Sequence, residues 1–227
     1  MTIRRGEPWG TRGALAADAP VFERDGAASA YLSELAGNPG ADTATGDDRA
    51  VLAEGTEFGL LGGDIHTTLG SPHHDEAALR AGDATRFPLD AGLVEATLED
   101  GGSLLSVFIA HLVAMEGRRV RGLFSTRTVV VMNASHRGRD DLGPRAHPND
   151  GRLDVTDGQL MLGDRLRARR RMPSGSHLPH PMLATSRAPR FEFIFSRPAS
   201  VELDGRPVGR VTAMSVLCLA DAVTVVA

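Results

Sequence analysis

The chain has 227 residues, of which 41% are hydrophobic and 24% are charged. This is the composition of a globular protein whose core can fold without disulfides or a structural metal, and it excludes a wholly disordered chain or a collagen-like fibre. The 25 basic residues are all arginines and are outnumbered by 29 acidic residues, so the net charge is −4. We therefore expect no nucleic acid as a partner. The lack of lysine excludes a Schiff-base lysine and a phosphate-loop lysine.

The single cysteine, Cys218, lies in the apolar run 216–220, which is typical of a buried and inert thiol. One cysteine also excludes an internal disulfide or a cysteine-based zinc site. No apolar stretch approaches the ~20 residues of a membrane span, and residues 1–6 lead into no apolar core of a signal peptide. We expect a soluble, cytoplasmic protein.

The first third of the sequence predicts short helices and strands. An irregular arm at residues 1–20 leads to a strand at 20–23 and a helix at 26–36 that Asp25 caps. A turn-rich linker at 37–50 follows. The next elements are a buried strand at 58–61, a helix from Asp64 to Leu69 with Asp64 as its cap, and a short helix at 75–81.

After residue 85 the pattern changes to short apolar, β-branched runs between turn signals, interrupted by one helix at 160–171. The predicted strands are 87–95, 104–115, 127–132, 152–155, 191–195, 199–203, 208–216 and 222–226. Such spacing favours an antiparallel sandwich or barrel. The predicted fold class is α+β, with a reduced α/β segment at 1–83 followed by a mostly antiparallel β-sandwich at 84–227.

Three turn motifs carry candidate functional residues. A strand followed by Gly62-Gly63-Asp64 and a helix containing Thr67 can aim backbone amides at a phosphate, although a plain strand-to-helix turn is the more common explanation. Asn149-Asp150-Gly151 is a turn signal, and Asp150 could also hold a hard cation such as Mg²⁺. Asp204-Gly205 between two alternating runs predicts a hairpin, and Asp204 could act as a general base if it faced a cleft.

The predicted helix at 160–171 carries a dense group of arginines: Arg165, Arg167, Arg169, Arg170 and Arg171. Arginines on a helix usually form a solvated face. A cluster of this density could also meet a phosphate or the anionic headgroups of a lipid surface. Both interpretations stay open from the sequence.

Taken in chain order, five segments resemble the diacylglycerol kinase and lipid kinase family, which is related in fold to NAD kinases and sphingosine kinases. Residues 58–70 are similar to the family's strand, Gly-Thr-Gly-Asn-Asp loop and helix, and residues 84–92 to its Arg-x-Ile-Asp-Leu-Gly strand. Residues 132–155 resemble its Asp-Asp-Gly-x-Leu-Asp stretch, 174–177 its Gly-x-His, and 203–205 its Asp-Gly-Glu hairpin.

The resemblance implies transfer of the ATP γ-phosphoryl group to a lipid hydroxyl, with Mg²⁺, in a cleft between an α/β domain and a β-sandwich. It implies Asp204 as the general base and Asp150 at a structural Mg²⁺ position. The nucleotide loop would contain Gly62, Gly63, Asp64 and Thr67.

The sequence also departs from the family. Its Gly-Gly-Asp-Gly-Thr phosphate signature is not found before residue 57, the later nucleotide loop is altered, and Arg206 replaces the glutamate of Asp-Gly-Glu. We therefore expect a relative that is truncated and degenerate in its nucleotide-binding part. Three hypotheses for its function stay open: an active lipid kinase, a non-catalytic relative that binds lipid, nucleotide or a separate partner subunit, or an unrelated enzyme. An edge strand would also permit a homodimer.

Overall fold

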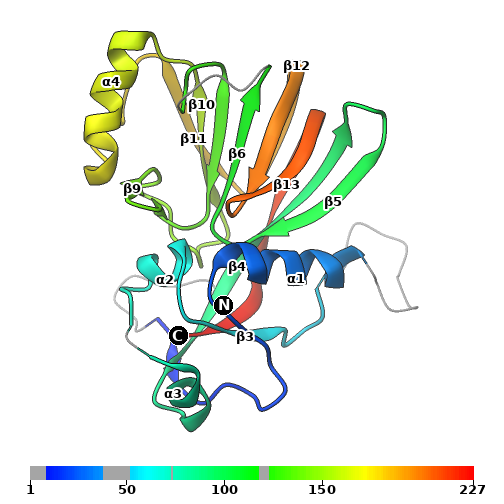
Figure 1. Ribbon diagram of the computed structural model, residues 1–227, viewed down its shortest axis with the longest axis vertical. Helices are drawn as coiled ribbons and strands as arrows, with labels where there is room; N and C mark the ends of the chain where they lie inside the picture. The colour runs from blue at the N-terminus through cyan, green and yellow to red at the C-terminus, as the bar shows by residue number, and fades with distance from the viewer. Residues whose placement is uncertain (1–8, 38–51, 73, 118–122) are drawn as a thin grey trace.

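The computed structural model describes residues 9–37, 52–72, 74–117 and 123–227. A mostly antiparallel, eleven-stranded sheet runs through the described chain, in the order β1-β4-β13-β12-β6-β7-β10-β11, with β2, β3 and β5 joined at its sides. Figure 1 shows most strands in the upper part with α4 beside them, whereas α1, α2, α3 and β3 lie below. This arrangement confirms the predicted α+β class.

Two long strands connect the upper and lower parts. β4 (Thr85–Leu98) and β13 (Arg206–Val226) pair antiparallel along most of their lengths, and β12 (Arg190–Leu203) pairs with the other edge of β13. The turn between β12 and β13 is Asp204-Gly205, with φ of 48° and 78°. Two positive φ angles are those of a type I′ turn, so the predicted hairpin is confirmed.

The other strands that extend the sheet are β5 (Ser103–Phe108), β6 (His111–Glu116), β7 (Thr128–Met132), β10 (Leu153–Gly158) and β11 (Leu183–Ala188). They follow the apolar runs only in part: β7 and β10 were predicted, the single predicted run 104–115 forms the two strands β5 and β6 because the chain turns at residues 109–110, and β11 was not predicted. A separate two-stranded hairpin consists of β8 (His136–Arg137) and β9 (Asp140–Asp141). α4 (Leu162–Arg171) confirms the helix predicted between the strands, and a short 3-10 turn, Met172–Ser174, follows it.

Two pairs of predicted strands are in fact single strands. Residues 191–195 and 199–203 both belong to β12, whose pairing with β13 is irregular between Ile194 and Ala199. Pro198 lies in this gap and has no N–H to donate, so the ladder is interrupted without ending the strand. Likewise β13 continues past an irregularity between Leu219 and Val223, where Asp221 has a positive φ of 51°.

The lower part contains the first helices and strands. They are β1 (Thr11–Arg12), β2 (Val21–Phe22), α1 (Asp25–Gly37), β3 (Glu57–Leu60), α2 (Asp64–Thr68) and α3 (Glu76–Ala81). The short helix predicted at 75–81 is confirmed as α3, and Asp75 caps it by accepting a hydrogen bond from the Ala78 N–H. Most of the predicted 37–50 linker lies outside the described residues.

The C-terminus of the chain belongs with the lower part. The last residues of β13 pair with β3 in parallel, and β3 pairs with β2 on its other side. Residues on either side of position 84 therefore share one sheet. Phe58, Leu60 and Ile65 are fully buried together with Leu32 of α1 and Val225 of β13. This cluster is a second hydrophobic core, separate from the one formed by the strands of the upper part. Within the described residues, no helix is long and apolar enough to cross a bilayer.

Candidate functional site

Asp25 joins the starts of two helices. It follows β2 and is the first residue of α1, but its carboxylate accepts hydrogen bonds from the N–H groups of Asp64 and Ile65 at the start of α2. The N–H groups of Ala27 and Ala28 in α1 instead donate to the Arg24 carbonyl. The prediction that Asp25 caps its own helix is therefore wrong, because the donors of α2 lie within reach of its side chain.

Asp64 does not cap α2 either, which corrects a second prediction. One of its carboxylate oxygens, Oδ1, accepts a hydrogen bond of 2.6 Å from the Gly138 N–H in the β8–β9 turn. The other, Oδ2, lies 3.7 Å from Nε2 of the buried His111. Asp64 therefore connects α2 to two segments of the upper part, while Asp25 accepts the hydrogen bonds of the free N–H groups at the start of α2.

Asp204 has a carboxylate that is enclosed by protein donors. Its Oδ2 accepts from the Ile109 N–H at 2.8 Å, and its Oδ1 accepts from Ala110 at 3.0 Å and His111 at 2.8 Å. The Nδ1 atom of His111 lies 3.3 Å from the same Oδ1, and the Asp204 side chain is 0% exposed. The hairpin between β12 and β13 is thus fastened to the turn between β5 and β6.

Three aspartates therefore meet where α1 and α2 contact the sheet. His111 lies between Asp64 and Asp204, and Asp25 is close enough to both carboxylates to be repelled by them. Burial, together with the negative charges of Asp204 and Asp64, raises the pKa of Asp25 from 3.8 to about 7. The two N–H groups of α2 oppose this rise only in part.

We expect the pH dependence of stability to report on Asp25. Because its pKa is higher in the folded protein, Asp25 contributes stability that is complete below about pH 4 and is lost as the pH rises through about 7. Between pH 5 and 8 the free energy of unfolding of the wild type should fall by about 2 kcal/mol more than that of Asp25→Asn. Urea unfolding at both pH values measures this difference, and parallel pH profiles would contradict the assignment.

The predicted nucleotide-loop residues surround this junction. A Cβ on Gly62 would lie 2.8 Å from the Glu23 carbonyl oxygen, and a Cβ on Gly63 would fall on the Asp25 carboxylate. Thr67 is exposed, and its hydroxyl donates to the Gly63 carbonyl at 2.9 Å. These residues lie together with Asp64, as predicted, and the two glycines pack against Glu23 and, at the start of α1, Asp25.

Asp150 lies in the loop before β10 and contacts different residues. Its Oδ2 pairs with Arg187, whose Nε lies 3.2 Å from Asp154, and its Oδ1 accepts from the Arg152 N–H at 3.1 Å. The guanidinium of Arg187 thus supplies positive charge between the two carboxylates. Among the described residues, no group of three or more His, Cys, Asp or Glu side chains is arranged to hold a metal.

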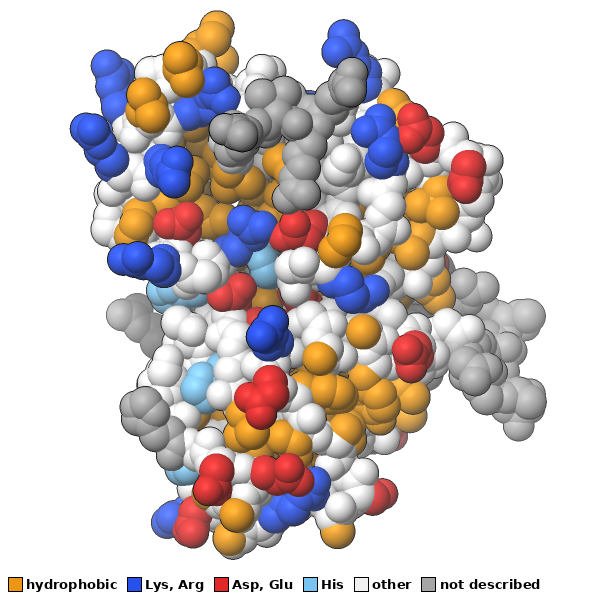
Figure 2. Space-filling model, viewed as in Figure 1, with side chains coloured by type: hydrophobic (Ala, Val, Ile, Leu, Met, Phe, Trp, Pro, Cys, Tyr) orange, Lys and Arg blue, Asp and Glu red, His pale blue; other side chains and the backbone are white. Residues whose placement is uncertain are grey.

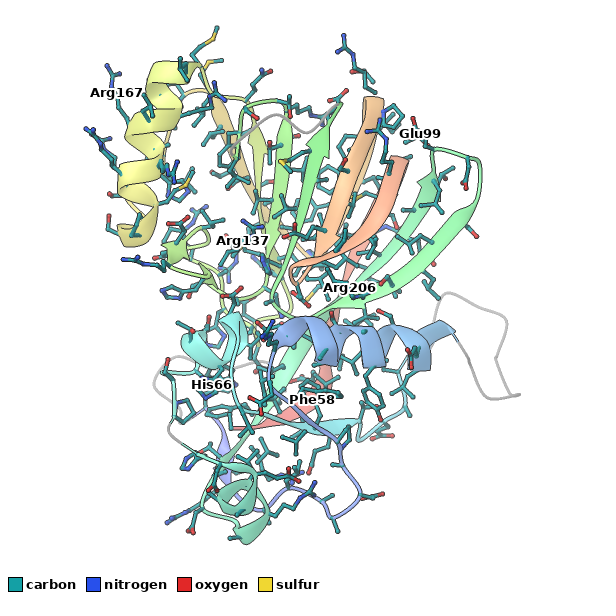
Figure 3. The ribbon with its side chains drawn as sticks, viewed as in Figure 1. Phe58, His66, Glu99, Arg137, Arg167 and Arg206 are labelled. Atoms are coloured by element: carbon teal, nitrogen blue, oxygen red, sulfur yellow. The ribbon has the colours of Figure 1, made fainter. Side chains whose placement is uncertain are left out.

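Arg206 connects β13 to α1. One guanidinium nitrogen lies 3.4 Å from the Ser33 hydroxyl of α1 and 3.5 Å from the Ser106 hydroxyl of β5. Figure 3 shows the side chain at the level of α1, where the upper and lower parts meet. At the position where the resemblance has a glutamate, this chain thus places a cation that hydrogen-bonds to structural serines.

Sequence reasoning missed Asp25, Gly26 and His111 as site residues. Asp25 and Gly26 are the first two residues of α1, which begins shortly after β2. The signal was a strand followed by Asp-Gly and a helix. A Cβ on Gly26 would lie 2.8 Å from the Asp204 carbonyl oxygen, which explains why this position needs glycine.

Comparison with solved structures defines the class of fold. The chain resembles a candidate diacylglycerol kinase from Bacillus anthracis str. Sterne with a TM-score of 0.61 and 13% identity, over 91% of this chain and 76% of that one. A diacylglycerol kinase structure from the same organism gives 0.55 and 15%, over 91% and 74%. The chain therefore has the fold of diacylglycerol kinase-like proteins.

Other comparisons add less. Yeast NADH kinase complexed with NADH gives a TM-score of 0.43 at 9% identity, over 92% of this chain and 60% of that one, which is too low to support an argument. No protein-family model matches the sequence, and no curated protein does.

The residues present do not fit Mg²⁺·ATP as they stand. The two N–H groups that begin α2 are bonded to Asp25, so a phosphate would have to displace that carboxylate. Three aspartates at the junction would also repel a triphosphate. At Asp150, Arg187 already neutralises the charge that a magnesium ion would neutralise. Mg²⁺ and ATP remain predictions of the resemblance.

Proposed function

We propose that this chain is a lipid kinase-like protein that transfers no phosphoryl group by itself. The observation that carries the proposal is the environment of Asp204. A general base must come within hydrogen-bond distance of the proton that it removes. The Asp204 carboxylate is 0% exposed and already accepts three peptide N–H groups, so it is a structural acceptor rather than a base that meets a hydroxyl.

Two further observations support the same proposal. Phosphoryl transfer depends on neutralising the charge of the nucleotide with correctly placed cations and donors. Here the donors at the start of α2 are taken by Asp25, and Arg206 hydrogen-bonds to serines of α1 and β5. Asp204, Asp64 and Thr67, which the resemblance assigns to catalysis or to the nucleotide loop, thus each have an internal partner.

A lipid phosphorylation assay tests the proposal. Purified protein is incubated with radiolabelled ATP, Mg²⁺ and dioleoylglycerol in mixed micelles, and labelled phosphatidic acid is measured. We expect no more product from the wild type than from Asp204→Asn or from a sample without protein. Mg²⁺-dependent product that Asp204→Asn loses would overturn the proposal.

A further inference from the structure

The outer face of α4 exposes apolar side chains among its arginines. Met161 is 71% exposed, Leu162 66% and Leu166 58%. Met182 is 50% exposed and directly precedes Leu183, the first residue of β11. Leu183 pairs with Gly158 of β10, which is three residues before Met161, so Met182 lies near the start of α4. These four are more than half of the seven large hydrophobic residues that are exposed in the described chain. Such a concentration marks an interaction surface.

The basic residues of α4 accompany this apolar face. Arg165, Arg167, Arg169, Arg170 and Arg171 are opposed within the helix by Asp164 alone. The last three lie in the final turn of α4, where the helix dipole stabilises positive charge. The dipole does not explain why leucines are exposed on the same helix. Figure 2 shows blue arginine atoms around orange hydrophobic atoms at the upper left, over α4.

A groove of about 480 Å³ continues this surface toward the sheet. Its apolar lining includes Leu162, Leu166 and Met172, and its arginines are Arg137, Arg165 and Arg169, beside one carboxylate, Asp140. Arg137 also pairs with Glu202 at 2.6 Å, so Arg165 and Arg169 are the arginines that would meet an anionic group. The buried Nε atoms of Arg137 and Arg165 have no hydrogen-bond partner. Figure 3 shows Arg137 between α4 and the sheet. Apolar walls with arginine nitrogens match a molecule that is apolar at one end and anionic at the other.

We propose that α4 and this groove form a docking surface for an anionic phospholipid bilayer. The arginines meet lipid phosphates, and Met161, Leu162 and Leu166 insert between the headgroups, as in helices that lie in the membrane interface. The protein as a whole has a charge of −4, so attraction to an anionic surface requires a local cluster of this kind. The inference is independent of whether the chain transfers a phosphoryl group.

The position of α4 relates this surface to the aspartate junction. The β8–β9 hairpin lies between α4 and α2, as Figure 1 shows. Arg137 of β8 lines the groove, and the adjacent Gly138 donates its N–H to Asp64 of α2. A bilayer that contacts α4 would therefore lie on the same side of the sheet as the β8–β9 hairpin.

Vesicle co-sedimentation tests the proposal. The wild type should sediment with vesicles of phosphatidylcholine containing 30% phosphatidylglycerol in 0.1 M NaCl, and much less with pure phosphatidylcholine or in 0.5 M NaCl. Each arginine near an anionic surface contributes roughly fivefold to binding, so Arg165→Gln/Arg169→Gln/Arg170→Gln should bind about a hundredfold more weakly. Leu162→Ser/Leu166→Ser should also weaken binding, and this loss should persist at low salt.

The matched control removes the same charge elsewhere. Arg12→Gln/Arg152→Gln/Arg190→Gln changes three exposed arginines outside α4, so it should lose no more than a few-fold in binding. Circular dichroism should give all variants the wild-type melting temperature within a few degrees, because none of these side chains belongs to the buried core. Equal loss in both triple variants, equal wild-type binding to both vesicle types, or no wild-type binding to either would overturn the proposal.

Discussion

Asp204→Ala should lower the melting temperature by about 10 °C or more, whatever the chain does with nucleotides or lipids. The substitution leaves the N–H groups of Ile109, Ala110 and His111 without their acceptor in a buried turn. Breaking a buried network of charge-assisted hydrogen bonds costs about 3–5 kcal/mol. Thermal unfolding followed by circular dichroism measures the effect.

Two comparisons make this result specific. Asp204→Asn keeps one oxygen acceptor and the residue's tolerance for positive φ, so its loss should be intermediate. Asp83→Ala removes an aspartate that is 69% exposed, and it should change the free energy of unfolding by about 0.5 kcal/mol or less. If all three variants had the melting temperature of the wild type, the Asp204 carboxylate would not stabilise the contact between the β12–β13 hairpin and the β5–β6 turn.

Gly63→Ala is expected to cost about 2–5 kcal/mol and to disturb the junction itself. Gly63 has φ of 107° and ψ of −172°, a conformation that residues with a Cβ rarely adopt. Its new methyl group would also fall on the Asp25 carboxylate, which must then move away from the N–H groups of Asp64 and Ile65. Denaturant unfolding gives the total loss.

Gly70→Ala supplies the matched control for the clash. Gly70 also has a positive φ, of 95°, but a Cβ there would meet no atom within 4 Å. It should therefore show only the backbone cost, about 1–2 kcal/mol. Combining Gly63→Ala with Asp25→Ala should recover the fraction of the lost unfolding free energy that is due to the clash, and it should leave the fraction that is due to the backbone conformation. Equal losses in the two glycine variants would contradict the close contact between Gly63 and Asp25.

Local sequence patterns predicted most of the individual elements. The apolar β-branched runs became β7 and β10, residues 75–81 formed the short helix α3 with its cap, and Asp204-Gly205 formed the hairpin. These features depend on neighbours a few residues apart, so periodicity and turn chemistry are sufficient to identify them. The continuity of β12 and β13 was missed because Pro198 and Asp221 are signals of an end, although here the strand resumes beyond them.

The chemistry of the site depends on contacts that no local pattern encodes. Asp25 reaches donors about 40 residues away, and Asp204 reaches donors more than 90 residues away. An aspartate before a glycine is equally consistent with a turn, a base or a metal ligand until its partners are known. For the same reason the sequence could indicate where Asp204 lies in the hairpin, but not that peptide N–H groups enclose its carboxylate.

We propose that internal carboxylates occupy the places where a kinase of this fold would meet its nucleotide. A thermal-shift titration with ATP, with and without Mg²⁺, tests it most directly, because a ligand of the native state raises the melting temperature by mass action. We predict no shift up to about millimolar ATP under either condition, since a Kd well above the ligand concentration leaves stability unchanged. A Mg²⁺-dependent rise that grows with ATP concentration would contradict the account.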